Sequence, residues 1–404
     1  MMLLGRSFLW DGLRRTALPL VLASGMLGSA LAEPSIPPSD DTVIEHLPGA
    51  RDQASKTARG LRMLLARAPT QIDLALRVAR DEIALGRAEG DPRHYGRAEA
   101  ALAPWIHLSD PSPQVLLLRA TLLQNRHDFE GALADLDRLI AADPRNAQAL
   151  LVRATVRQVR GDYALAAADC RALEPLAQQA VVATCLAATL GVTGRGDAAL
   201  AALAQASSSF TQDSEPELAL WSLTLTGELA ARLGRPDLSE AAFVRASALG
   251  RRDVYLLGAY ADFLLDRNRP SEVVALLKDE TRVDPLLLRL AIAERQLAAP
   301  GADAQVADLA ARFDTARRRG DTIHRREEAR FQLALMHNPD EAVALAQANW
   351  SVQREPADAR ILLEAAEASG QPRAAAPVLA WVRENRIEDI QIAGCIARLF
   401  PHRS

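Results

Sequence analysis

The sequence predicts an all-α protein built as an α-solenoid, which is a stack of helix–turn–helix units. Of its 404 residues, 49% are hydrophobic but only 4% are aromatic, and this balance suits close-packed helices better than β-sandwiches. One pattern of apolar and small residues occurs twice, at 113–146 and at 147–180, with a spacing of 34 residues. Turn signals such as Asp-Pro and Gly-Asp recur between helical segments in the rest of the chain.

The repeated pattern describes two short helices joined by a turn. In the first copy it consists of Leu116, Ala120, Leu123, Asp128-Phe129, Ala132, Leu136 and Leu139, closed by Asp143-Pro144. In the second copy it consists of Leu150, Ala154, Gly161-Asp162-Tyr163, Ala166, Cys170 and Leu173. The alanines stand where the two helices meet, so we expect the backbones to approach closely there. Each unit leaves an apolar face that only the next unit can cover, and the units must therefore stack.

This pattern resembles the tetratricopeptide repeat, a helix–turn–helix of about 34 residues. The resemblance is strongest over 113–180; elsewhere Leu and Ala mostly replace the Trp and Tyr of the family's first helix. It implies a right-handed α-solenoid of about eight repeats over 50–404. Beyond the two clear repeats, we expect helices at 50–68, 72–85, 92–105, 286–297, 304–318, 326–335, 341–353, 359–368 and 374–382, a turn at 194–197, a polar loop at 207–217, a unit closed by Asp284-Pro285, and a capping helix at 390–399.

The first 49 residues carry signals for export. Arg6, Arg14 and Arg15 form a positive region before an apolar run at 17–30, and Ala30-Leu31-Ala32 is a small-x-small cleavage site. These features predict a signal peptide over 1–32. The alternative is an uncleaved anchor, but the run is shorter than the roughly 20 residues of a membrane span.

Residues 33–49 contain four prolines and are expected to form a flexible leader. We therefore expect an exported protein, periplasmic in a Gram-negative bacterium, with no stable membrane span once the signal peptide is removed.

No signature of enzyme chemistry is present. The sequence lacks H-E-x-x-H, G-x-S-x-G and C-x-x-C, so we expect no catalytic residues, no cofactor and no enzyme activity. The seven histidines are scattered without i, i+4 spacing, which argues against a metal site. A net charge of −4 without a basic stripe argues against nucleic acid as a partner.

Cys170 and Cys185 lie on either side of a turn at Glu174-Pro175. Antiparallel helices would place them opposite each other, and paired cysteines in an oxidising compartment are often bridged. They are therefore candidates for a disulfide, and the alternative is two small core residues in a helix–helix seam. Cys395 would remain in the capping helix.

In tetratricopeptide arrays the first helix of each unit, helix A, lines a concave groove. The register of the resemblance implies that the groove residues are Gln114, Leu117, Thr121 and Gln124, with Gln148, Leu151, Thr155 and Gln158 one unit later. Gln and Thr side chains can hydrogen-bond an extended peptide backbone; the alternative is ordinary solvated positions. The carboxylate clamp of chaperone-binding members is not expected, because Thr121 and Thr155 stand where it has Asn and no Lys is present.

The leading hypothesis is a non-enzymatic scaffold that binds a protein or peptide partner in its concave groove. The family and the compartment together imply a role in assembling an envelope or secretion complex. An alternative is an all-helical protein that binds or processes glycans, against which the low aromatic content and the scattered histidines argue. A third reading is a structural spacer without a ligand.

Overall fold

The computed structural model describes residue 39, residues 53–207 and residues 215–401. The expected signal peptide, nearly all of the expected leader and much of the polar loop at 207–217 lie outside these residues. The described part of the chain contains twenty α-helices, one 3₁₀-helix and no β-strand, which confirms the all-α prediction. All of these helices belong to one unit, residues 50–404. Among the described helices, none has the length and apolar character needed to cross a bilayer.

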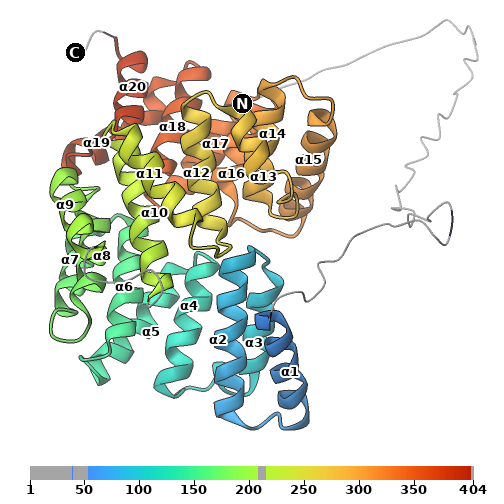
Figure 1. Cartoon of the computed structure of the whole chain (residues 1–404), viewed down its shortest axis with the longest axis vertical. Coiled ribbons are helices and arrows are strands. Elements are labelled where there is room, and N and C mark those ends of the chain that lie inside the picture. The colour runs from blue at the N-terminus through green and yellow to red at the C-terminus, as the bar shows by residue number, and fades with distance from the viewer. Residues whose placement is uncertain (1–38, 40–52, 208–214, 402–404) are drawn as a thin grey trace, which may run out of the picture. The chain divides into compact units, whose positions relative to one another are not determined.

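The helices follow one another as antiparallel hairpins, shown from blue to red in Figure 1. Their bounds are α1 Gln53–Arg67, α2 Ile72–Glu89, α3 Arg93–Ile106, α4 Pro113–Asn125, α5 Phe129–Ala142, α6 Ala147–Arg160, α7 Tyr163–Ala172, α8 Gln179–Leu190, α9 Gly196–Ser207, α10 Pro216–Arg232, α11 Pro236–Ser247, α12 Val254–Asp266, α13 Pro270–Leu277, α14 Asp284–Gln296, α15 Ala302–Arg318, α16 Arg325–Ala334, α17 Pro339–Trp350, α18 Pro356–Ala368, η1 Pro372–Ala375, α19 Ala376–Asn385 and α20 Ile390–Leu399. From α2 onward the described residues form nine helix pairs, where about eight were expected.

Proline marks the beginnings of many helices. It occupies the first turn of α4, α10, α11, α13, α17 and α18. Its missing N–H costs nothing there, since the first N–H groups of a helix have no partner within the helix. The same rule corrects one expectation. Asp284 and Pro285 do not close the fifth unit; they are the first two residues of α14.

The helices of a pair meet through small residues. Ala120, Ala132, Ala154 and Ala166 are at most 2% exposed. In α10 the same role falls to Gly227, because a Cβ there would lie 2.7–2.8 Å from ring atoms of Phe243. Small side chains in these seams allow the close backbone approach that the sequence predicted.

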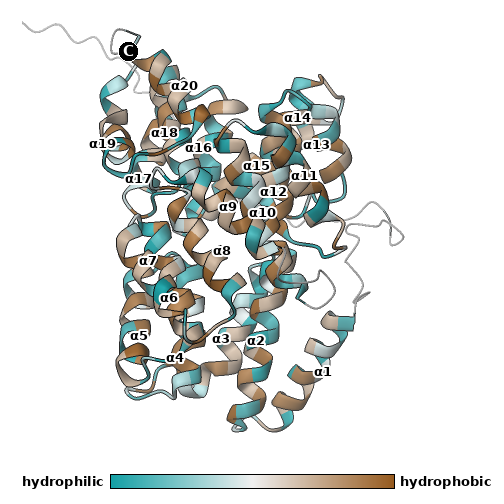
Figure 2. Cartoon of the chain, turned by 60° about the vertical axis from the view of Figure 1, so that its left-hand side comes forward, coloured by the Kyte–Doolittle hydropathy of each residue, from teal (hydrophilic) through white to brown (hydrophobic). Residues whose placement is uncertain are grey.

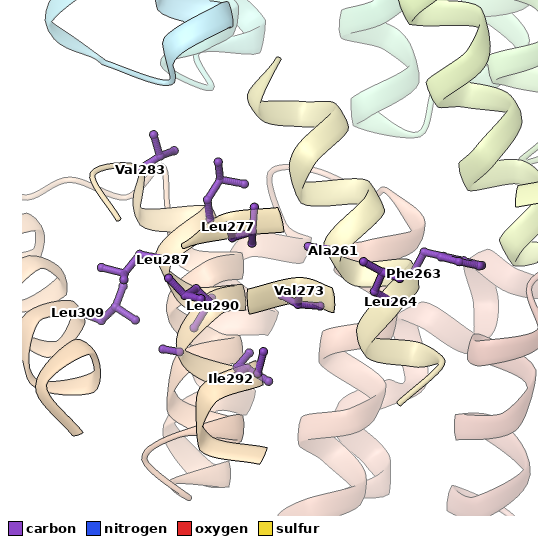
Figure 3. Packing of buried hydrophobic residues seen from close by; sticks show 14 of the residues in the cluster. Ala261, Phe263, Leu264, Val273, Leu277, Val283, Leu287, Leu290, Ile292 and Leu309 are labelled. Atoms are coloured by element: carbon purple, nitrogen blue, oxygen red, sulfur yellow. The ribbon is translucent and has the colours of Figure 1, made fainter. Parts of the chain in front are cut away.

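Larger apolar residues fill the space between successive pairs. Figure 3 shows this packing in the later units, where side chains from α12, α13, α14 and α15 meet. Helix α8 is apolar along most of its length, as Figure 2 shows, because it packs on α6, α7, α9 and α10 at once. A helix covered on several sides needs no polar face.

An Arg–Asp pair joins the two helices of each clear repeat. Arg119 on α4 donates to both carboxylate oxygens of Asp135 on α5, at 2.7 and 2.6 Å. Thirty-four residues later, Arg153 on α6 bonds Asp169 on α7 in the same way, at 3.1 and 2.7 Å. The pair is thus part of the repeat, although the sequence pattern above was built from apolar and small residues alone.

Turns of the early units contact segments far along the chain. The amide of Arg354 donates to Val159 O at 2.7 Å, and the hydroxyl of Tyr163 donates to Arg354 O at 2.8 Å. The indole of Trp381 in turn donates to the Tyr163 hydroxyl at 3.1 Å. Tyr163, which the sequence marked as a repeat position, therefore also contacts the last units.

Cys170 on α7 and Cys185 on α8 are joined by a disulfide in the structure, with their Cα atoms 5.6 Å apart. Both side chains are buried, so they also occupy the helix–helix seam that was the alternative. Cys395 on α20 is a buried free cysteine.

Candidate partner-binding groove

The groove register of α4 and α6 can be extended to other first helices. In α4 the small seam residue is Ala120. Its buried partners on α5 are Ala132 and Leu136, which come 12 and 16 residues later. The same spacing identifies Gly86 in α2, Ala187 in α8 and Gly227 in α10 as seam residues. Counted from them, the positions equivalent to Gln114 and Thr121 are Arg80 and Arg87 in α2, Val181 and Ala188 in α8, and Trp221 and Glu228 in α10.

Two hollows lie along these helices. The first hollow has a volume of about 370 Å³ and is lined by Ile72, Asp73, Leu76, Arg77 and Arg80 of α2, with Ser112 and Gln114 at the start of α4. The second hollow has a volume of about 400 Å³ and is lined by Arg87 of α2, Leu151 and Thr155 of α6, Val181 of α8, and Glu217, Leu218 and Trp221 of α10. The second hollow is thus built by residues from four first helices.

The structure brings some of the predicted groove residues to these hollows and not others. Gln114 lines the first hollow, and Leu151 and Thr155 line the second. Four further residues are exposed or partly exposed but line neither hollow: Gln148, Leu117, Gln124 and Gln158.

Thr121 differs from the expectation of an open position. It is 6% exposed, and its hydroxyl donates to Leu117 O, one helical turn earlier, at 2.9 Å. Its hydroxyl proton is therefore used within α4, as that of Thr155 is used within α6, where it is donated to Leu151 O at 3.0 Å.

Several residues that line the second hollow were not among the predicted groove residues, namely Arg87, Val181, Leu218 and Trp221. Trp221 stands at the position of Gln114 and Gln148, and Arg87 stands at the position of Thr121 and Thr155. The sequence did contain a signal for three of these four residues. The register of the clear repeats, carried into α2, α8 and α10, points to Arg87, Val181 and Trp221.

Charge is distributed unevenly around the hollows. Glu217 is paired with Arg251 at 2.5 Å. Arg77, Arg80 and Arg87 are exposed on α2, and none of them has a hydrogen bond or ion pair within the described residues. We call these three residues the arginine stripe. It is a local feature of one helix in a chain whose net charge is −4, and the expectation that nucleic acid is not a partner stays a prediction.

The later first helices carry charges that are paired with one another. The Asp262 carboxylate on α12 accepts from Arg289 on α14 at 2.6 Å and from Arg330 on α16 at 2.5 Å. Burial by itself would raise the pKa of Asp262, but the two guanidinium groups outweigh burial and lower that pKa well below its usual range. Arg360 on α18 makes two 2.6 Å bonds to Asp266, so α12 is linked to α14, α16 and α18.

A second group of charges lies at the start of α18. Arg326 on α16 approaches Glu355 at 3.1 Å and the fully buried Asp358 at 3.4 Å. Burial and then the nearby Asp358 carboxylate raise the pKa of Glu355 to about 7. On the neighbouring helices, the hydroxyl of Tyr255 donates to Glu228 at 2.8 Å.

No family model matches the chain, and no curated protein matches it in sequence. Similar solved structures include a tetratricopeptide repeat protein from Parabacteroides merdae (14% identity, covering 63% of this chain and 90% of that chain, TM-score 0.39). They also include the APC/C hetero-tetramer Cut9–Hcn1 (14% identity, covering 85% of this chain and 66% of that chain, TM-score 0.49). A third is yeast Tom70 (15% identity, covering 85% of this chain and 62% of that chain, TM-score 0.42). The chain spans less than two thirds of the matched chains' length in the last two.

The 34-residue spacing, the small-residue seams and the stacked helix pairs decide the type of fold. The fold is a tetratricopeptide-type α-solenoid. Its two hollows lie along the A helices, where the sequence analysis expected the groove.

One group of side chains in this solenoid has a composition suited to a metal. Glu89, Asp91 and His94 offer ligand atoms within 4.8 Å of one another. Each of them already has a partner: His94 contacts Glu82 at 2.6 Å and Glu89 at 3.2 Å, and both carboxylate oxygens of Asp91 accept from Arg93. The group is accounted for as an ion-pair network at the turn between α2 and α3.

Proposed function

We propose that this tetratricopeptide-type solenoid is a non-enzymatic scaffold that holds a protein or peptide partner along helices α2 to α10. The observation that supports this is the second hollow, where Trp221 and three aliphatic side chains remain partly accessible. Tryptophan is among the residues that contribute most to binding when they are packed in a pocket. The groove is therefore suited to a large apolar side chain of a partner.

The scaffold acts by offering a preformed surface. The A helices are held by close-packed seams and by the repeated Arg–Asp pairs, so little of the groove has to become ordered when a partner binds. Binding free energy is lost when mobile groups are immobilised, and a rigid solenoid avoids most of that loss.

The proposed setting is an oxidising compartment, and the proposed role is the assembly of an envelope or secretion complex. Two features support the compartment: the signal-like segment at 1–32 and the facing positions of Cys170 and Cys185. Disulfides persist in exported proteins and are rare in the cytosol.

The proposal is tested by crosslinked capture of partners from periplasmic extract, using residues 33–404 and identification by mass spectrometry. Trp221→Ala and Leu151→Ala should each reduce capture of the main partner by about tenfold or more, as expected for truncation at the centre of an interface. Leu165→Ala is the matched control, because Leu165 is exposed on α7 and lines neither hollow.

Circular dichroism confirms that each variant is folded. If folded wild-type protein enriches no partner, the scaffold proposal is wrong, and binding of a soluble glycan by the same sample would support the glycan alternative.

A further inference from the structure

We propose that the arginine stripe makes this groove selective for an acidic, extended segment of the partner that carries a bulky apolar residue. This inference rests on the scaffold function proposed above and goes further by naming the chemistry of the bound segment. It follows from three features: the placement of the arginines on α2, the absence of partners for their charges in the described chain, and the apolar hollow at one end of the stripe.

The three arginines lie on one face of α2. Their spacing of three and seven residues brings them back to the same side of a helix with 3.6 residues per turn. Arg77 and Arg80 border the first hollow, and Arg87 borders the second. The stripe therefore runs beside both hollows and connects them.

The stripe has an excess of positive charge. Asp73 is the one carboxylate that borders the first hollow, so the two hollows together have three arginines and two carboxylates on their walls. Glu217, the other carboxylate, is already paired with Arg251, which lines neither hollow. A guanidinium group binds a carboxylate through two parallel hydrogen bonds, so acidic side chains are the best-matched ligands.

The spacing of the stripe predicts the spacing of the acidic residues. Arg80 and Arg87 are seven residues apart, which is about 10.5 Å along a helix. A peptide extended in the polyproline II conformation has three residues per turn and rises about 3.1 Å per residue, so residues i and i+3 lie on the same face about 9 Å apart. Two acidic residues at positions i and i+3 would therefore meet Arg80 and Arg87.

The apolar residue of the segment belongs next to the acidic residue that meets Arg87. Arg87 shares the second hollow with Leu151, Leu218 and Trp221. A leucine or aromatic side chain there would cover the indole of Trp221 while its neighbour's carboxylate binds the guanidinium. The bound sequence is thus acidic-x-x-acidic-apolar, or the same order reversed, because an extended chain can lie in either direction.

The test measures binding of short peptides by fluorescence anisotropy. The probes are fluorescein-labelled Glu-Ala-Ala-Glu-Leu and Leu-Glu-Ala-Ala-Glu with blocked ends, and the comparison peptides have Lys in place of Glu. Wild-type protein should bind at least one acidic peptide about tenfold more tightly than its Lys counterpart. The affinity should fall as the salt concentration rises from about 50 to about 300 mM, because salt screens exposed charge pairs.

The deciding variant is Arg80→Glu/Arg87→Glu, which should weaken binding of the acidic peptide by about tenfold or more. Arg59→Glu/Arg171→Glu makes the same change in net charge at exposed positions on α1 and α7 that line neither hollow, and it should leave binding unchanged.

Equal losses in both variants, no preference for Glu over Lys, or no binding of either acidic peptide would overturn the inference. So would equally tight binding of a single-stranded oligonucleotide, because the stripe would then be a general polyanion site.

Failure of this inference is distinguishable from failure of the scaffold function. If Trp221→Ala abolishes capture of a partner from extract while Arg80→Glu/Arg87→Glu does not, the groove binds a partner but the stripe does not select it. If wild-type protein captures nothing, the scaffold function itself fails.

Discussion

The first helices of the early units and those of the later units differ in how their charged side chains are paired. Helices α2 to α10 border two hollows and present the partly exposed Trp221 and unpaired arginines. Helices α12 to α18 carry Asp262, Asp266, Arg330 and Arg360, which pair with one another between units. One repeat architecture therefore leaves the three arginines of the stripe unpaired in one region and links the first helices by ion pairs in the other.

This difference separates a role in binding from a role in stability. A charge without a partner can still interact with a ligand, whereas a paired, partly buried charge would have to give up an existing bond first. Asp262 touches two neighbouring units and Arg360 spans from α18 to α12. We expect substitutions in the early groove to change binding, and substitutions in the later network to change the free energy of unfolding.

The largest effect is expected for Asp262→Ala. It leaves Arg289 and Arg330 facing each other without their shared carboxylate, and removal of one member of this partly buried charge network should cost about 2–4 kcal/mol. The control is Asp197→Ala, which removes a 77% exposed side chain paired with Arg235 and should cost less than about 1 kcal/mol. Urea unfolding followed by circular dichroism measures both, and similar losses in the two variants would contradict the proposed difference.

A loss of about 3 kcal/mol is expected for Cys170→Ala/Cys185→Ala, because the bridge closes a segment of 15 residues and restricts the unfolded chain. A reducing agent should produce a comparable loss in wild-type protein and none in the double variant. Intact-mass analysis after alkylation in denaturant without reductant provides the control, since only Cys395 should then be modified. If Cys170 and Cys185 are also modified under these conditions, the bridge is absent.

A smaller effect is expected from the titration of Glu355, which should change the free energy of unfolding by about 1–2 kcal/mol between low and neutral pH. Because the pKa of Glu355 is raised to about 7 in the folded protein, its proton is bound more tightly there than in the unfolded chain. The stability contributed by this proton is present at low pH and is lost as pH rises from about 4.5 through 7. Asp262, whose pKa is lowered, has the opposite dependence, and its contribution is lost as pH falls below about 4.

Glu355→Gln should therefore flatten the decrease in unfolding free energy between pH 5 and pH 7.5, and the Asp262 variant should leave that decrease unchanged. Urea titrations at several pH values measure both slopes. An unchanged slope in Glu355→Gln would show that other groups determine the pH dependence.

The sequence predicted the helices and the repeat well because both depend on local chemistry. Apolar periodicity, proline at helix starts and small residues 12 positions apart belong to single hairpins, so Ala120 and Ala132 could be identified without coordinates. The residues that line the hollows were predicted less completely. Thr121 and Thr155 occupy equivalent positions, yet one is buried and the other lines the second hollow, because different neighbours surround them.

By itself, then, the sequence determined the all-α class, the 34-residue unit and the pairing of its helices, since each of these follows from residues within about one repeat of one another. Only the tertiary structure decided which side chains of the first helices stay accessible at the hollows. Arg87 and Trp221 are more than a hundred residues apart, and their place at one hollow depends on how four first helices are stacked. The pairing of Asp262 with Arg330 and of Asp266 with Arg360 depends on the same stacking, because contacts between units are set by the accumulated geometry of the seams.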